Sequence, residues 1–423
     1  MSLETLYSKV SRHLLPLLLL GYIAAYLDRV NVGFAKLQML GDLKFSDTVY
    51  GLGAGIFFIG YFVFEVPSNL MLHRVGARVW LARIMISWGV LSAFMMLVTT
   101  PTAFYILRFL LGAAEAGFFP GVIFYLTQWY PAAQRGRVTA IFMTGIAICS
   151  VVGSILSGGI MQSFDGVNGW AGWQWLFLLE AVPAVLIGFC ILFWLDERIE
   201  SATWLTHEEK KQLTDALAHD AGAGTEGRLA DAFRDRRVWL GCLIYFCIVM
   251  GLYGIGFWLP TIVSDMGIKG PFHIGLVTAI PYAVAAVGMV LVGRSADRRG
   301  ERRWHVAIPA ALGALGLVLS VVAAKNLVLA LTGLTAGALG ILTAAPLFWS
   351  IPTSYLKGTA AAAGIAIINS FGNLAGFVSP YLVGWTKDLT GSTAAGVYVL
   401  AAFVFSAAVL VLVGVRPGYR DIK

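Results

Sequence analysis

The sequence of 423 residues has little charge, few cysteines and no pattern that binds nucleotide phosphates or metal ions. Only 13% of its residues are charged, against roughly 25% in soluble domains, which argues against a soluble protein. Its four cysteines are scattered through apolar segments without metal-ligand spacing, as expected of buried small hydrophobic residues. No G-x-x-x-x-G-K-[ST] loop supports an ATP-driven pump within this chain. We therefore predict no enzyme, no catalytic residue, no metal site and no cofactor beyond a proton as coupling ion.

Long apolar runs are what the sequence has instead, with 58% hydrophobic residues. The runs are long enough to cross a hydrocarbon core of about 30 Å, and the strand alternation of a membrane β-barrel is absent. The first run lacks a small-residue cleavage pattern and is expected to remain as a span. We predict an all-α membrane protein with twelve transmembrane helices, near residues 13–36, 49–72, 79–99, 102–127, 138–161, 172–195, 238–263, 273–293, 304–324, 327–350, 358–386 and 393–415.

Basic residues in the loops set the predicted orientation. With both termini in the cytoplasm, 23 of the 30 basic residues lie on the cytoplasmic side. Arg29 and Arg108 lie in the membrane, and the others lie outside, at Lys36, Lys44, Lys269, Lys325 and Lys387. This bias explains the net charge of +7 without a nucleic-acid partner. We predict a multi-pass protein of the inner (plasma) membrane, with the lipid bilayer as its surroundings and a monomer as the default state.

A polar stretch divides the chain into two halves. We predict an N-terminal six-helix bundle at 1–195, a cytoplasmic linker at 196–237 and a C-terminal six-helix bundle at 238–423. Within the linker, Thr206 and Glu209 form a capping box that predicts a short helix to about Ala218. A flexible Gly/Ala stretch at 221–227 should follow. We interpret the linker as a tether between bundles rather than as a regulatory domain.

An internal repeat supports the two halves. The stretch HRVGAR at 73–78 follows the second span, and DRRGER at 297–302 follows the eighth, 224 positions later. Repeated halves are typical of transporters. Basic side chains at these helix ends could hold the halves together in one state and release them in another. The predicted cytoplasmic gating residues are Arg74, Gly76, Arg78, Asp297, Arg298 and Gly300.

The six-plus-six layout with these basic glycine turns resembles the major facilitator superfamily. Five further motifs resemble its anion:cation symporter family, which includes tartrate, phthalate, hexuronate and galactonate permeases. They are YLDRVN at 26–31, GYFVFEVPSN at 60–69, RFLLGAAE at 108–115, FWLP at 257–260 and NSFGN at 369–373. One departure is His73, where many facilitators carry Asp in the first basic turn.

Ionised residues within predicted spans are the strongest functional signal, because each costs about 3 kcal/mol near the bilayer centre. Asp28, Arg29, Arg108 and Glu115 all lie in the first half. Arg108 and Glu115 are seven residues apart, so on one helix they share a face about 10 Å apart. Glu180 has no evident partner in the sequence and is interpreted as structural, as is Glu65. By our boundaries, spans seven to twelve contain no Asp, Glu, Lys or Arg in their interiors.

Arg108 is the first candidate to bind a substrate carboxylate, because guanidinium offers a planar fork that matches it. Arg29 is either a second such group or the neutralising partner of Asp28, and a purely structural Asp28–Arg108 ion pair is the alternative. The resemblance implies anion contact at both Arg positions and a cavity position for Tyr61. Neutral residues should hold the rest of the substrate. The neutral substrate-binding candidates are Tyr61, Tyr253, Trp258, Trp349, Ser350, Asn369 and Asn373.

Asp28 and Glu115 are the predicted proton-coupling residues. Burial favours the neutral carboxyl and a nearby Arg favours the charged one, so a carboxyl between these influences can load and release a proton. Resemblance to galactonate-type permeases implies this role at both positions. We prefer Glu115 as the coupling site.

The sequence thus predicts a proton-coupled symporter that imports a small organic anion by alternating access. Sugar acids, tartrate-like hydroxy acids and aromatic acids all suit the candidate residues. The stretch at 153–159 lacks the Gly-Pro pair of drug and antiporter relatives, which favours import over export. An anion-binding membrane sensor, or a uniporter or exchanger of the same anions, remains as an alternative.

Overall fold

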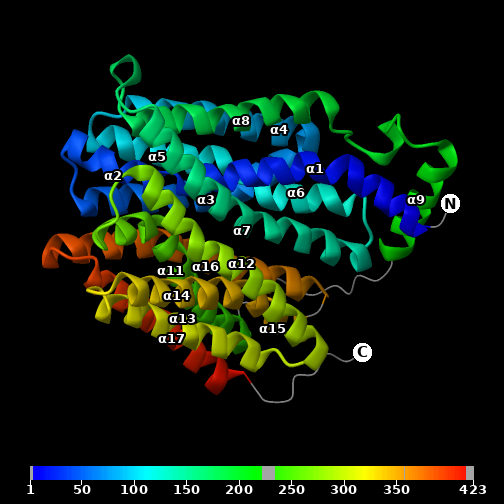
Figure 1. Cartoon of the computed structure of the whole chain (residues 1–423). Coiled ribbons are helices and arrows are strands. Elements are labelled where there is room, and N and C mark those ends of the chain that lie inside the picture. Colours follow the sequence, from blue (N-terminus) through cyan, green and yellow to red (C-terminus); the bar gives the residue numbers. More distant parts are fainter. Residues whose placement is uncertain (1–2, 222–233, 357, 416–423) are drawn as a thin grey trace.

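The structure is a computed structural model that describes residues 3–221, 234–356 and 358–415. Every regular element in these residues is helical, and Figure 1 shows the helices in two groups, α1 to α8 and α11 to α17. Eleven helical segments are long and apolar enough to cross a membrane. The 32-residue helix α7 (Ala132–Ser163) takes the place of the fifth predicted span. The prediction of an all-α membrane protein with twelve spans is confirmed.

The first helix group contains two breaks inside spans that we predicted as continuous. Asn31 separates α1 from α2, and Gly117, with a φ of 87°, separates α5 from α6. Its other helix ends follow local signals, such as Thr100, whose hydroxyl accepts the Ala103 amide before Pro101. The helices of this group, besides α7, are α1 (Leu3–Val30), α2 (Val32–Leu43), α3 (Asp47–Val75), α4 (Ala77–Phe94), α5 (Pro101–Glu115), α6 (Phe118–Thr127) and α8 (Gly172–Trp194).

The second helix group repeats the plan, with its own break at Trp349 inside the tenth predicted span. Its helices are α11 (Arg236–Asp265), α12 (Pro271–Arg299), α13 (Arg303–Val322), α14 (Leu327–Phe348), α15 (Ser350–Tyr355), α16 (Gly358–Thr390) and α17 (Ala394–Gly414).

The linker begins with a packed segment. The predicted capping box is present: the Thr206 hydroxyl accepts the Glu209 amide at 3.3 Å, and the Glu209 carboxylate accepts the Thr206 amide at 2.8 Å. Helix α9 (His207–Ala221) ends three residues later than predicted. Glu209 also binds Lys9 of α1 at 2.8 Å, and the Lys9 ammonium lowers the pKa of this carboxyl, assisted by the Thr206 amide. Residues 222–227 of the predicted flexible stretch lie outside the described residues.

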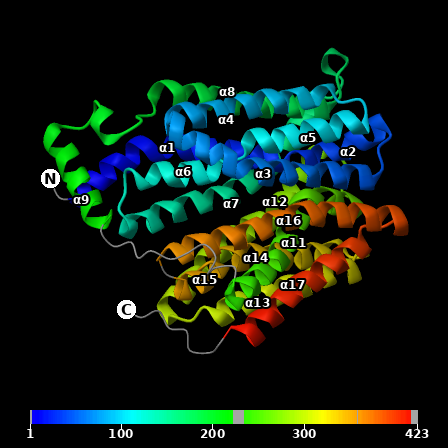
Figure 2. The same cartoon turned by 180° about the vertical axis from the view of Figure 1, so that it is seen from behind.

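The two helix groups meet closely at the end of the molecule opposite to the two chain termini (Figure 2). Glycines allow this contact between α3 and α16. A Cβ on Gly51 would lie 2.4 Å from the Pro380 carbonyl oxygen, and one on Gly384 would lie 2.2 Å from the Asp47 carbonyl oxygen. Small residues let helix backbones touch in this way. With the predicted orientation, this is the outer end, and we use that name below.

Candidate functional site

Arg29 links the two helix groups in the middle of the molecule. Its guanidinium forms an ion pair with Glu115 at the end of α5, and its Nη1 donates to the Tyr253 hydroxyl of α11 at 3.4 Å. Its Cζ atom lies 5.4 Å from the ring centroids of both Phe57 and Tyr61 on α3. The Arg29 side chain is 18% exposed and that of Glu115 only 1%. The structure therefore brings four predicted residues together: Arg29, Tyr61, Glu115 and Tyr253.

Close packing between α3 and α5 positions this group. A Cβ on Gly112 would lie 1.9 Å from the Phe57 carbonyl oxygen, and one on Gly60 would lie 2.2 Å from that of Phe109. Helix α5 then ends at Glu115, because Gly117 takes a left-handed conformation that other residues rarely adopt. Glu115 is therefore presented at a helix end, where its carboxylate reaches Arg29 of α1.

Arg108 lies deeper than Arg29 and is fully buried. Its Nε donates to the Gly53 carbonyl at 3.2 Å and its Nη2 to the Ala54 carbonyl at 3.3 Å, while Nη1 has no partner. It forms no ion pair with any residue that the structure describes. The structural Asp28–Arg108 ion pair is thus absent, and the pair that does form is Arg29–Glu115. In this conformation Arg29, rather than Arg108, is the guanidinium that a solute can reach.

Asp28 points away from its neighbour Arg29, as the turn of about 100° per residue requires. Its carboxylate accepts a hydrogen bond from Ser92 of α4, and a second from Asn31 Nδ2 at 3.4 Å. The side chain is 1% exposed, and Oδ2 has no partner. Asp28 therefore lies inside the first helix group rather than between the groups.

Four of the neutral candidates of the second helix group, Trp349, Ser350, Asn369 and Asn373, lie along α14 to α16. Trp349 packs on Tyr245 with ring centroids 4.7 Å apart. The Ser350 hydroxyl, at the start of α15, donates to the Leu347 carbonyl near the end of α14 at 2.6 Å. Asn369 and Asn373 are half-buried on α16, and Asn373 Nδ2 has no partner. The structure does not show these four side chains in contact with Arg29 or Glu115.

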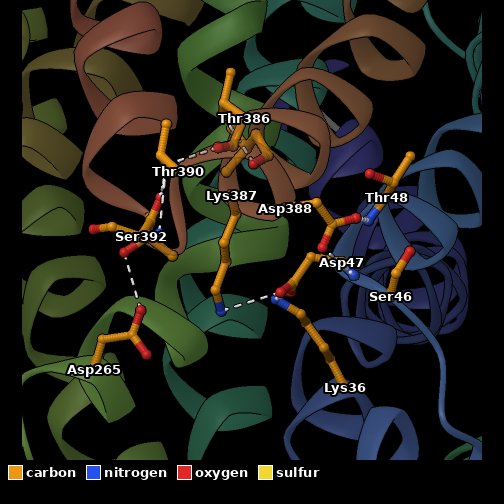
Figure 3. Close-up of polar contacts among 12 residues, drawn as sticks. Lys36, Ser46, Asp47, Thr48, Asp265, Thr386, Lys387, Asp388, Thr390 and Ser392 are labelled. Carbon is orange, nitrogen blue, oxygen red and sulfur yellow. Dashed lines mark hydrogen bonds and ion pairs between the residues drawn. The ribbon is translucent and has the colours of Figure 1, made fainter.

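Trp258, another predicted substrate residue, belongs to a polar cluster at the outer end. Figure 3 shows the charged members of this cluster. We call Lys36, Asp47, Trp258, Lys387 and Asp388 the outer cluster. Lys36 Nζ lies 3.4 Å from the Trp258 ring centroid and 2.7 Å from Asp47 Oδ1, and Lys387 Nζ lies 3.5 Å from Asp47 Oδ2. Asp388 of α16 accepts the first two amides of α3, at 3.1 and 2.7 Å. The cluster therefore joins the two helix groups at this end.

The sequence did not reveal the outer cluster. From the sequence, Lys36 and Lys387 are predicted to be basic residues outside the membrane, yet the Lys36 side chain is only 3% exposed. Asp47 and Asp388 are 341 positions apart, and no motif relates them. The only signal is a coarse one, namely that charged residues flank four predicted spans at one side of the membrane.

In both predicted gating turns the glycine has a positive φ, 100° at Gly76 and 59° at Gly300. Glu197, which sequence reasoning missed, accepts the Ala77 and Arg78 amides at 2.7 and 2.9 Å. Its carboxylate thus caps the start of α4, just after the turn in which His73 stands where many facilitators carry Asp. Its position just after the sixth span was the available signal.

The ion pairs that the described gating side chains form stay within one helix group. Asp297 pairs with Arg302 at 2.7 Å, in the second group. Among the described residues, Arg74, Arg78 and Arg298 form no ion pair with the opposite group. These turns therefore do not hold the halves together in this conformation.

The sequence profile of the Major Facilitator Superfamily matches residues 18–380. A protein of Agrobacterium vitis, provisionally named tartrate transporter, is 49% identical over 98% of this chain and 92% of that protein. A quinolone resistance transporter of Acinetobacter baumannii is 42% identical over 93% of this chain and 91% of that protein. The inner membrane transport protein RhmT of Escherichia coli is 40% identical over 95% of this chain and 93% of that protein.

The fold is similar to that of the inward open xylose transporter XylE from Escherichia coli. The TM-score is 0.73, with 95% of this chain and 96% of that chain covered. Only 16% of the aligned residues are identical, so this likeness concerns the fold alone.

Proposed function

Because the chain belongs to the major facilitator superfamily, and is a secondary transporter of the inner membrane rather than an enzyme, we propose that it imports a small organic carboxylate with protons. The observation that carries this proposal is the Arg29–Glu115 ion pair, which also reaches Tyr253 of the opposite helix group.

The ion pair suggests how proton and anion are coupled. While Glu115 is ionised it occupies the Arg29 guanidinium, whose planar fork would otherwise bind a substrate carboxylate. A proton on Glu115 removes that competitor, and the substrate carboxylate takes its place. Arg29 also donates to Tyr253, so the exchange of anions acts at the seam between the two helix groups. Asp28 is the second proton-coupling candidate, inside the first group.

Alternating access requires that the seam close at one end while it opens at the other. The outer cluster and the glycine contacts of α3 with α16 close the outer end in this structure. The turns at Gly76 and Gly300 are the proposed cytoplasmic gate, which would pair across the seam in the opposite state. The linker with α9 would tether the two bundles.

A tartrate-like hydroxy acid is the substrate that we propose, supported by the name of the Agrobacterium vitis relative. Arg29 would bind one carboxylate. Arg108, whose Nη1 is free, would serve a second carboxylate once the surrounding helices rearrange. Tyr61, Tyr253 and Asn373 would face the hydroxyl groups. Trp349, Ser350 and Asn369 would line the same region, while Trp258 would act in closing the outer end.

Export of an aromatic acid is the second candidate function, which the name of the quinolone resistance relative favours. Purified protein in liposomes separates the possibilities. With an inside-alkaline pH gradient, labelled tartrate should accumulate above its external concentration, and an uncoupler should abolish the accumulation. Equilibration without accumulation would indicate a uniporter, binding without uptake a sensor, and proton-driven movement of a quinolone alone an exporter. Each of these three results would contradict the proposal.

A further inference from the structure

A second group of buried polar residues, which includes Asp28, lies inside the first helix group. We call Asp28, Asn31, Ser92, Ser157 and Glu180 the buried acid cluster. All five are at most 2% exposed. They come from α1, the α1–α2 junction, α4, α7 and α8. Neither the proposed exchange at Arg29 nor the outer cluster uses Glu180.

The hydrogen bonds of the cluster leave three acceptor atoms without a partner. Ser157 donates to Glu180 Oε1 at 2.6 Å, while Ser92 and Asn31 Nδ2 both donate to Asp28 Oδ1. The Asn31 side chain also interacts with Glu180, and so lies between the two acids. Asp28 Oδ2, Asn31 Oδ1 and Glu180 Oε2 remain unpaired. Buried polar atoms are normally hydrogen-bonded, so these three acceptors need a donor, and a proton on one of the carboxyls would supply it.

The charges that face the cluster distinguish the two acids. Asp28 accepts two hydrogen bonds, and the fully buried Arg108 acts on it electrostatically. Glu180 is compensated by neutral groups alone, the Ser157 hydroxyl that donates to it and the Asn31 side chain, and neither acid has an ion pair with a described residue. Among the described residues, a further titratable group near Glu180 is the Cys149 thiol of α7, which donates to the Ile23 carbonyl at 3.3 Å. A buried carboxylate with so little compensation takes up a proton instead of staying charged.

We propose that the buried acid cluster is a second proton-binding site, separate from Glu115, and that Glu180 holds the proton. The proton comes from water and bonds to Glu180 Oε2, which then donates to Asn31 Oδ1. This single bond satisfies two of the three unpaired atoms. Asn31 lies at the junction of α1 and α2, only two residues from Arg29, so occupancy of this site acts on the helix that carries the anion-binding guanidinium.

Infrared spectroscopy of the purified protein tests the assignment without any transport measurement. Near pH 7 the spectrum should contain the carbonyl stretch of a buried protonated carboxylic acid. The band should shift when glutamate carboxyls are labelled with carbon-13, and stay unchanged when aspartate is labelled. It should be lost in Glu180→Gln, and retained in Glu115→Gln and in the exposed control Glu208→Gln on α9.

Several results would overturn the proposal. The wild-type band could be absent, could follow the aspartate label, or could survive in Glu180→Gln. Loss of the band on adding sodium chloride at constant pH would show that the oxygens bind a sodium ion instead of a proton. Because the labelling uses the unaltered protein, misfolding of a variant cannot decide the outcome. A normal band with no proton-driven uptake would contradict the proposed function and leave this site intact.

Discussion

Replacing Glu115 by glutamine should change how substrate affinity depends on pH. In the wild-type protein the substrate carboxylate competes with ionised Glu115 for Arg29, so it binds to the form in which Glu115 carries a proton. Above the pH at which Glu115 ionises, binding must take up one proton. Affinity for tartrate should then fall about tenfold per pH unit, or about 1.4 kcal/mol. Glutamine keeps the shape of the side chain but has no charge to compete, so this dependence should disappear.

Two estimates of the size of the effect agree. Over about three pH units the linkage amounts to about 4 kcal/mol, or roughly 1,000-fold in affinity. Separately, the loss of one partner from a buried ion pair costs about 3–5 kcal/mol. In Glu115→Gln that cost falls on Arg29, and the substrate carboxylate relieves it. The variant should therefore bind tartrate more tightly than the wild type at high pH, by up to that amount.

Calorimetric titration with tartrate between about pH 6 and about pH 9 measures how its affinity depends on pH. The carboxylates of tartrate stay ionised over this range, which lies well above a carboxyl pKa of about 4, so the substrate itself adds no pH dependence. Glu208→Gln, on the exposed face of α9, is the matched control and should keep the wild-type slope. Counterflow exchange should persist in Glu115→Gln, while accumulation driven by a proton gradient is lost. Equal slopes in the wild type and the variant, or weaker binding by the variant at every pH, would refute the competition between Glu115 and substrate.

Four further predictions follow from the described contacts. Arg108→Lys should weaken tartrate binding at least tenfold in equilibrium titration, because an ammonium cannot reproduce the fork; a change within about threefold, below ~1 kcal/mol, would exclude a clamp role. Asp388→Asn should favour opening of the outer end about fivefold, since a lost helix-terminal anion costs about 1 kcal/mol; spin-label distances between α3 and α16 report it, and an unchanged distribution counts against the outer cluster. Gly76→Ala should lower thermal stability in detergent by about 1–3 kcal/mol, owing to its φ of 100° beside Glu197; an unchanged melting temperature would show that the turn relaxes. A monocarboxylate carried with two protons should give an inward current, favoured by about 2.3 kcal/mol per 100 mV; the current should vanish in Asp28→Asn, and silent membranes with a proven monoanion would leave one coupling proton.

Much of the fold and part of the site could be predicted from local sequence signals. Long apolar runs identify the spans because the bilayer requires a fixed length, and the capping box at Thr206 identifies the start of α9. Asp28, Arg29 and Glu115 stand out because an ionised group is costly in such a run. The roles assigned to these residues stay predictions.

Pairing between distant segments could not be predicted. Arg108 and Glu115 do lie on one continuous helix, α5, as expected, but the sequence could not show that Glu115, at the end of α5, forms an ion pair with Arg29 of α1. Helical periodicity gives no information on which span lies beside which. For the same reason Glu180 had no evident partner, although Ser157 lies 2.6 Å from it. Hydropathy also treats a flanking lysine as solvated, whereas Lys36 lies against the ring of Trp258.

The glycine contacts between α3 and α16 have a consequence for the kinetics of the transport cycle. Where Gly51 meets the Pro380 carbonyl, no flexible side chain lies between the two backbones. A gap of about 1 Å already removes up to about half of the dispersion attraction at such a contact, and packed interfaces of this kind are bistable rather than elastic. The outer end should therefore switch between two discrete states with long dwell times. Single-molecule fluorescence traces should show abrupt steps rather than a gradual drift. The height of the barrier between the two states should then set the turnover rate.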